Sequence, residues 1–447
     1  MAMQQGQSVP TEEHHAPEGY SSWPSYWKAH GQPWRSEPGI SQRRQQFLAE
    51  RRVIQPDIAR GLYPFSGVAL TRADVEWLLT THESGGMRGP VDWMDINQRT
   101  RQGLDLRGAQ LQRAVLSELP LARVQCGLDI AEWGNTSTEG VDAAAANMER
   151  CMLVTSHLEE ACLNRVQLQR ADMAAAHLEG AALVEAHLEQ ADLFGAHLEG
   201  AILTGTYLAG AQLDTAYLDS STNLTNVSLD NDIFGFAHLG RVRWGGADLS
   251  AISWSQAKKG VRRNRPVAIV LGEERVARAS QDLNNRPKLR RTRLGEYEAA
   301  VRANHQLAVV LREQGLSEDA DRFAYKAQFL QRQVLWLQGR PGAALGSLFL
   351  DLVAGYGYRP LRSFIAYVVI ICAFAGAYLL NAQFAAPHLT WDEALVLSIS
   401  SFHGRGFFPS EISLGDTLAR VAAGEAIVGL LIEITFIATF TQRYLAR

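Results

Sequence analysis

Residues 171–200 read ADMAAAHLEG AALVEAHLEQ ADLFGAHLEG, and this stretch decides the fold of much of the chain. An apolar residue occupies every fifth position, and an alanine stands two residues before each one. The apolar positions are Met173, Leu178, Leu183, Leu188, Leu193 and Leu198. A helix repeats every 3.6 residues and a strand every two, so neither produces a period of five. The stretch therefore predicts a solenoid of short stacked units.

The period of five extends well beyond this stretch. It runs without a break from Met148 to Leu218, which makes 15 units. A slip of one residue near Ser221 resets the frame, which continues at Leu224, Leu229, Phe234, Leu239, Trp244 and Leu249. An earlier block uses Leu106, Leu111, Leu116 and Leu121. Residues 127–145, between the two blocks, lose the period, so we expect an excursion or a cap there.

These units resemble the pentapeptide repeat, A-(D/N)-L-x-x, most closely at Ala171-Asp-Met, Ala191-Asp-Leu and Ala247-Asp-Leu. The resemblance covers residues 101–251. It implies a right-handed quadrilateral β-helix with four units per coil, in which the central Leu and the Ala two before it point inward. Neighbouring coils would then lie about 4.8 Å apart, one strand spacing.

The motif His-Leu-Glu recurs inside the repeat at His157, His177, His187 and His197. At 20 residues per coil, three of these histidines should stack on one face: His157, His177 and His197. Glu159, Glu179 and Glu199 should lie beside them. The simpler interpretation is a solvated face on which histidines soften the repulsion between glutamates. The alternative is a ladder that binds a divalent metal or senses pH.

The last 85 residues have a different pattern. Phe364–Leu380 is an uncharged apolar run, and Val421–Phe440 is a second one that contains Glu425 and Glu433. The length of each run is close to the ~20 residues that a helix needs to cross a bilayer. Between them, residues 390–409 begin as an amphipathic helix too short to span and end in a Gly-x-Gly turn. Such a loop is tolerated at membrane depth only where protein or water covers its backbone, so we expect a re-entrant loop.

Residues 363–447 resemble the pore domain of the two-transmembrane potassium-channel superfamily: outer helix, pore helix, selectivity filter and inner helix. The family's Thr-Val-Gly-Tyr-Gly filter falls here on Phe402, His403, Gly404, Arg405 and Gly406. Both glycines match and the other three positions differ, so the resemblance implies the architecture and a homotetramer rather than potassium selectivity. Arg405 either points outward, where it would pair with Asp392, Glu393 or Glu411, or faces the axis and favours anions.

Three residues of the second apolar run are predicted to line the pore: Glu425, Gly429 and Glu433. Eight positions subtend 80° beyond two helical turns, so both carboxylates fit within one wide face. Rings of carboxylates would concentrate cations below the filter. Gly429 is either a point where the helix bends or a point of close helix packing.

The remaining segments divide as follows. Residues 1–100 are expected to be partly disordered and then to form a cap. Residues 252–294 carry 12 basic and 3 acidic side chains, which indicates a linker, a lipid-binding segment or a surface that docks on the acidic repeat. Two amphipathic helices, Glu296–Gln314 and Ser317–Leu337, predict a helical hairpin at 295–338. The apolar run Ala343–Val353 predicts an interfacial segment at 339–362.

Basic residues set the expected topology. Arg340, Arg359 and Arg362 precede the first apolar run and Arg443 and Arg447 follow the second. Both termini should therefore be cytoplasmic in a two-span protein of the cell inner (plasma) membrane. Its four cysteines show no paired spacing, and we found no signal peptide, metal-ligand spacing, nucleophile motif or phosphate-binding loop.

These features together predict a function. We expect a membrane ion channel that conducts a monovalent cation, with membrane lipids as partners and a cytoplasmic pentapeptide-repeat domain for regulation or assembly. We expect neither an enzyme nor a nucleic-acid partner, cofactor or resident metal. The alternative is a membrane-anchored interaction scaffold without ion conduction.

Overall fold

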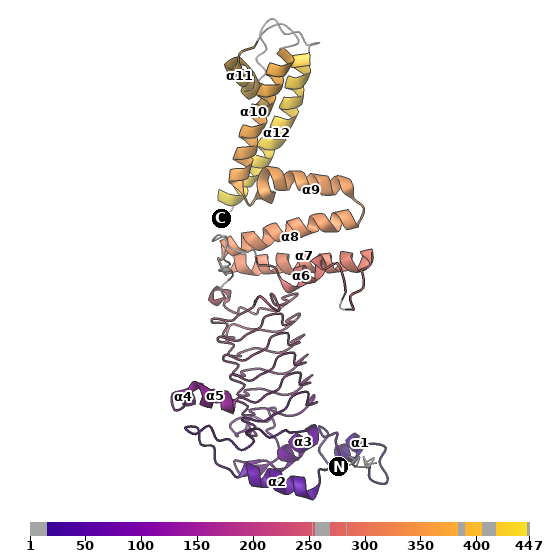
Figure 1. Cartoon of the computed structure of the whole chain (residues 1–447), viewed down its shortest axis with the longest axis vertical. Coiled ribbons are helices and arrows are strands. Elements are labelled where there is room, and N and C mark those ends of the chain that lie inside the picture. The colour runs from indigo at the N-terminus through magenta and orange to yellow at the C-terminus, as the bar shows by residue number, and fades with distance from the viewer. Residues whose placement is uncertain are drawn as a thin grey trace, which may run out of the picture. The chain divides into compact units, whose positions relative to one another are not determined.

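The computed structural model describes residues 16–252, 254, 269–282, 284–382, 389–404 and 417–444. It divides into two compact units, Met1–Val276 and Ala277–Arg447 (Figure 1). The first unit is dominated by stacked coils. The second unit consists of helices.

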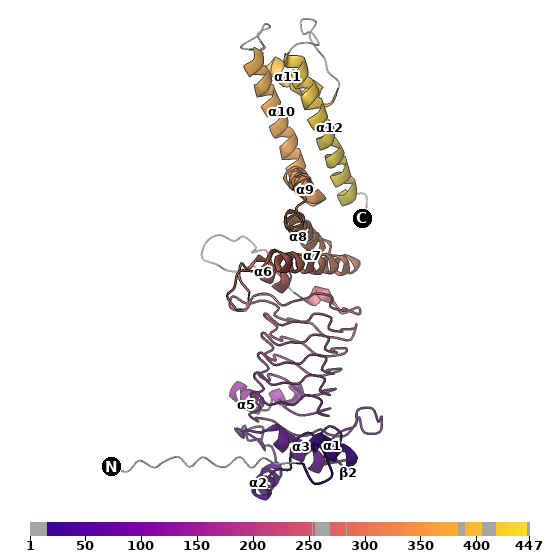
Figure 2. The ribbon, with the colours of Figure 1, turned by 90° about the vertical axis from the view of Figure 1, so that its right-hand side faces the viewer.

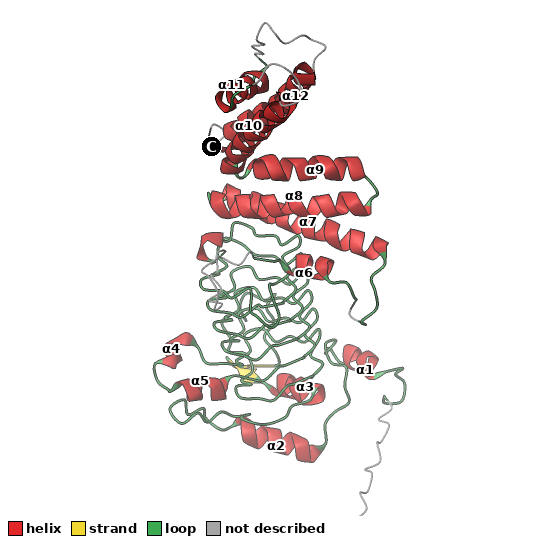
Figure 3. Ribbon diagram, turned by 45° about the horizontal axis from the view of Figure 1, so that its top comes forward, coloured by secondary structure: helices red, strands yellow, loops and turns green. Residues whose placement is uncertain are grey.

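Residues 105–243 of the first unit form a four-sided β-helix. Isolated parallel bridges recur every five residues and join positions 20 residues apart, as in His157–His177–His197. Four ladders run along the stack. Three begin at Asp105, Val115 and Pro120, and the fourth, which contains Gln110, begins with a bridge from Ala69. Figure 3 draws the coils as loops and turns because each side contributes a single bridge rather than a long strand.

The interior and the corners of the β-helix follow the repeat. The central apolar residue and the alanine two before it point inward as predicted, and Ala176, Leu178 and Leu188 are all 0% exposed. The residue two after the central position turns the corner with a positive φ, which is 57° at Arg150 and 68° at Gly180. Glycine adopts this conformation without strain, whereas other residues do not.

Residues 127–145 leave the stack between two coils. Gln110 is bridged to Asn147 and Gln125 to Cys162, so the coils before and after the segment remain adjacent. It contains α4 (Ile130–Trp133) and α5 (Thr138–Ala144), which stand beside the coils in Figure 1. The segment is therefore an excursion rather than a cap.

A second interruption was not predicted. Asn223 bridges Ile202, 21 positions earlier, but His238 bridges Gln212, 26 positions earlier. The chain between Asn223 and His238 therefore contains five additional residues. The prediction that Phe234 is a central, inward residue is wrong, because this insertion moves it out of the frame and leaves it only partly buried.

The chain before the β-helix pairs with its first coil. Gly67 N–H donates to Gly108 O and Leu70 N–H donates to Gln110 O, each at 2.9 Å. The elements of this part are α1 (Trp23–Ala29), α2 (Gln42–Arg52), α3 (Arg72–Thr81), β1 (Glu83–Ser84) and β2 (Met87–Arg88). They gather at this end of the coils in both Figure 1 and Figure 2. After the last coil come the short turn η1 (Leu249–Ala251) and α6 (Gly272–Arg278).

The second unit begins with a helical hairpin of α7 (Arg290–Glu313) and α8 (Ser317–Leu337). Apolar residues such as Ala300, Leu330 and Val334 pack between the two helices. The second helix has the predicted bounds. The first starts six residues before the predicted Glu296, because part of the basic stretch is helical, and Arg290 Nε donates to Leu337 O at 2.8 Å.

The remaining helices are α9 (Pro341–Ala354), the short η2 (Gly355–Gly357), α10 (Pro360–Ala382), α11 (Trp391–Phe402) and α12 (Thr417–Tyr444). Two stretches are long and apolar enough to cross a membrane, Leu361–Asn381 in α10 and Thr417–Ala438 in α12. The 12 residues of α11 reach only about 18 Å, so α11 is too short to span. Apolar side chains of α9 are exposed, including Leu345 at 55% and Leu352 at 67%.

Candidate functional site

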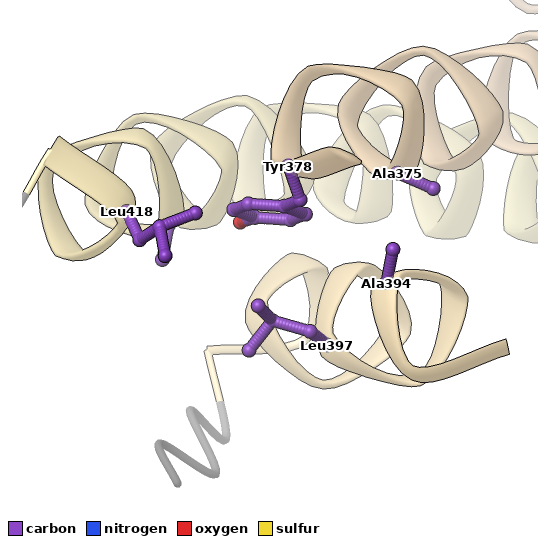
Figure 4. Close-up of a cluster of buried hydrophobic side chains, with 6 residues drawn as sticks. Ala375, Tyr378, Ala394, Leu397 and Leu418 are labelled. Carbon is purple, nitrogen blue, oxygen red and sulfur yellow. The ribbon is translucent and has the colours of Figure 1, made fainter. Parts of the chain in front are cut away.

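The short helix α11 is held against the two membrane-length helices. Figure 4 shows Tyr378 of α10 and Leu418 of α12 facing Leu397 of α11. Ala375 and Ala394 are both 0% exposed, and their small side chains let α10 and α11 approach closely. The α11 side chains that face α10 and α12 are therefore buried in protein.

A carboxylate joins the three helices. Glu425 of α12 is 0% exposed, and its Oε2 accepts a hydrogen bond from the Tyr378 hydroxyl at 2.5 Å. Ser398 Oγ lies 2.5 Å from Glu425 Oε1 and 3.0 Å from Ile371 O. The single hydrogen of the Ser398 hydroxyl is shared between these two acceptors, Glu425 Oε1 and Ile371 O.

The two glutamates of α12 have different surroundings. The Glu425 carboxylate faces α10 and α11 within its own chain, and the pore-lining role of Glu425, Gly429 and Glu433 stays a prediction. Glu433 is 36% exposed, and its Oε1 lies 3.4 Å from His403 Nε2. The other ring nitrogen of His403, Nδ1, lies 2.9 Å from Ile399 O.

Gly429 marks a close approach between α12 and the end of α11. A Cβ atom at this position would lie 2.0 Å from Phe402 O, a separation that no real contact allows. At Gly424, on the same helix, a Cβ would meet nothing within 4 Å. Of the two roles considered for Gly429, close packing is the one that these contacts explain.

The predicted filter residues are only partly within the described chain. Phe402 is 1% exposed and packs edge-on against Tyr367, with ring centroids 5.0 Å apart. Gly404 has a φ of 66°, and its N–H donates to Ser401 O at 2.9 Å. Glycine in this conformation commonly ends a helix. Arg405 and Gly406 lie outside the described residues, as does Glu411.

The start of α11 is fixed by a capping box. The backbone N–H and the hydroxyl of Thr390 both donate to Glu393 Oε2, at 2.8 and 2.7 Å. The first of these bonds satisfies the N–H of the residue that precedes the helix, as in a capping box. One of the acidic residues predicted to pair with Arg405 therefore already has a local role.

A polar cluster that the sequence analysis missed ties α8 and α9 to the start of α10. Asp351 of α9 lies 2.9 Å from Arg332 Nη1 and 3.3 Å from Arg362 Nη1. The Tyr325 hydroxyl donates to Asp351 Oδ1 at 2.8 Å, and burial, followed by this bond, raises the pKa of Tyr325. The available signal was a single aspartate within the apolar run Ala343–Val353. The apolar pattern of that run predicts a segment along the membrane surface and indicates no partner for the aspartate.

The histidine ladder on the β-helix is confirmed as a stack. Ring centroids of His157 and His177 lie 4.9 Å apart, those of His177 and His197 5.1 Å, and Tyr217 continues the row. Each imidazole Nδ1 contacts the glutamate two residues later, and the distance from His157 to Glu159 is 2.8 Å. That bond raises the pKa of His157. Each carboxylate therefore already has an imidazole partner, although its second oxygen has none among the described residues.

Comparisons with known proteins concern the first unit. The family described as pentapeptide repeats (8 copies) matches over residues 171–210, 181–219 and 191–231. No match was found among curated proteins.

Three similar solved structures are pentapeptide repeat proteins. Rfr23 from the cyanobacterium Cyanothece 51142 is 24% identical, with 32% of this chain and 88% of that chain covered and a TM-score of 0.22. A protein from the Arabidopsis thaliana thylakoid lumen is 23% identical, with 22% and 63% covered and a TM-score of 0.20. HetL from Nostoc sp. strain PCC 7120 is 22% identical, with 36% and 77% covered and a TM-score of 0.14. The family match identifies residues 171–231 of this chain as pentapeptide repeats, which imply a right-handed β-helix.

Proposed function

We propose that four copies of residues 363–447 form the pore of a cation-conducting membrane channel, with the β-helix as a cytoplasmic domain for regulation or assembly. The observation that carries this proposal is the position of α11. A helix too short to span a membrane is packed between two that are long enough, and Glu425 fastens it to both.

The rival function, a membrane-anchored scaffold, explains less of this region. An anchor needs one apolar helix, and neither a third short helix nor a carboxylate buried among the three would add to it. Ionisable groups within membrane segments are costly and are usually functional. A re-entrant helix needs protein around it at membrane depth, and α10 and α12 supply that cover.

The charges beside the end of α11 favour cations. The C-terminal end of a helix carries a partial negative charge, and Glu433 lies near it through His403. Four copies of this arrangement around an axis would attract cations to the cavity below the filter. Arg405 would then point outward, into the wall of the pore.

The segment before α10 gives the channel a route for regulation. Exposed leucines of α9 would lie along the inner membrane surface, and the Asp351 cluster would join α8 to the base of α10. A displacement of the helical hairpin would therefore reach the outer helix of the pore. The basic side chains before the first span and after the second favour a cytoplasmic location for both termini, in the inner (plasma) membrane.

The test is ion flux through the purified full-length protein in liposomes, with reversal potentials measured in planar bilayers under gradients of monovalent cations. We expect cation current from the wild type and from Gly424→Ala. We expect its loss in Gly429→Ala, because the added Cβ would displace the end of α11. Native mass measurement should give a tetramer. A folded wild-type protein that is monomeric or carries no current would overturn the proposal in favour of the scaffold.

A further inference from the structure

Three potential metal ligands meet near the last coils of the β-helix, away from the histidine ladder. Asp214, His238 and Glu273 each offer one ligand atom, and these atoms all lie within 4.8 Å of one another. They come from three segments. His238 is bridged to Gln212, two residues before Asp214, and Glu273 is in the first turn of α6. No spacing in the sequence indicated that they would meet.

Two glycines make room for this cluster. A Cβ on Gly240 would lie 2.3 Å from Asp214 Oδ1 and 3.1 Å from Glu273 Oε1. A Cβ on Gly272 would lie 2.3 Å from His238 Cδ2. The carboxylates and the imidazole therefore approach the backbone at the two positions where no side chain obstructs them.

The carboxylate of Glu273 is buried without a partner. The residue is 8% exposed, and neither of its oxygens has a hydrogen-bond partner among the described residues. A buried carboxylate without a partner is costly unless something binds it.

We propose that Asp214, His238 and Glu273 bind a divalent transition-metal ion, with Zn²⁺ as the ion of best fit. One imidazole nitrogen and two carboxylate oxygens form a donor set typical of Zn²⁺, with bonds of about 2.0–2.2 Å. Ca²⁺ and Mg²⁺ prefer oxygen ligands alone. Three protein ligands leave the fourth position of a tetrahedral site for water. The three side chains would draw slightly closer around the ion.

The metal would fasten α6 to the end of the β-helix. Gly272 N–H already donates to Ala237 O at 3.2 Å, which sets α6 beside the coil that carries His238. An ion held by Glu273 and His238 would strengthen this contact. A solenoid exposes an apolar end unless something covers it, so the site would stabilise the cover of the final coil.

The test uses the full-length protein in detergent, treated with EDTA and dialysed, then titrated with Zn²⁺ against a chromogenic chelator. We expect one tightly bound equivalent, and a loss of at least 10-fold in affinity in Glu273→Gln and in Asp214→Asn. Zn²⁺ should raise the melting temperature of the wild type but not of Glu273→Gln. Circular dichroism of the metal-free variants should match that of the wild type.

The histidine ladder provides the control, because two groups on it also bring His and Glu together. A variant with His157, His177 and His197 all changed to Gln should keep the tight equivalent. Failure of the wild type to bind Zn²⁺ would overturn the proposal and leave a proton shared by Asp214 and Glu273 as the explanation. Binding that persists in Glu273→Gln or disappears in the ladder variant would also overturn it.

Discussion

In the β-helix each coil repeats the contacts of the coil before it, whereas in the bundle of α10, α11 and α12 each polar contact occurs once. Leu178 and Leu198 occupy equivalent positions one coil apart and are equally buried. Glu425 and Gly429 have no counterparts in the part of this bundle that the structure describes. A repeated contact can be lost from one coil while its neighbours remain, because solenoid stability is a sum over adjacent units. When a contact occurs only once, no equivalent contact remains to hold the helices after it is lost.

The largest change in stability should come from a cavity inside the β-helix. Leu188→Ala removes a fully buried side chain and should lower the free energy of unfolding by about 2–5 kcal/mol. Phe194→Ala, at an outer position that is 47% exposed, should change it by less than about 0.5 kcal/mol. Chemical denaturation followed by circular dichroism measures both. Equal effects would mean that the interior is not packed around the central position.

The bundle should respond to a single added methyl group. Gly429→Ala places a Cβ against Phe402 O and should cost about 1–3 kcal/mol through overpacking. Gly424→Ala meets open space and should gain up to about 1 kcal/mol, because alanine is the better helix former. Thermal unfolding in detergent should therefore shift in opposite directions. Shifts of the same sign would show that α12 does not touch the end of α11.

The role of Glu425 can be separated from that of a pore-lining charge. Glu425→Ala removes the acceptor of the buried Tyr378 hydroxyl, while Ser398 keeps Ile371 O, and should cost about 1–3 kcal/mol. Glu425→Gln keeps one acceptor and one donor, so it should be nearly neutral for stability. Melting temperature and cation current should be measured for both variants. Equal loss of current without loss of stability would instead place this carboxylate in the pore.

The same contrast explains what the sequence could predict. In the repeat every contact lies at a fixed offset, so the period alone predicted the interior leucines and the stack of His157, His177 and His197. It failed where the period was broken, at Phe234, because an insertion of five residues resembles one more unit. The position of residues 127–145 beside the stack also needed the structure.

In the helical region, hydrophobic length predicted α10 and α12, and amphipathic pattern predicted α8. The partners of Glu425 and Asp351 could not be predicted, because they depend on how each helix is rotated about its axis. That rotation is set by packing among segments far apart in the chain. The cluster of Asp214, His238 and Glu273 was missed for the same reason.

The smallest effect that we predict concerns pH and the histidine ladder. The hydrogen bond to Glu159 raises the pKa of His157, so the protonated imidazole binds its partner better in the folded state. This stabilisation is fully present below the unfolded pKa of about 6.5 and is lost as pH rises through the higher folded value. The side chain of His157 is 44% exposed, so solvent screens the pair and its contribution should stay below about 1 kcal/mol.

Melting temperatures of the wild type and His157→Gln should therefore differ more at pH 6 than at pH 8.5, with the wild type the more stable at pH 6. In a Glu159→Gln background the same substitution should show much less of this pH dependence, because the acceptor that raises the pKa is gone. The opposite result would be a difference in melting temperature between the wild type and His157→Gln that grows toward pH 8.5. It would show that His157 is held neutral in the folded chain and that stacking, rather than charge, stabilises the ladder.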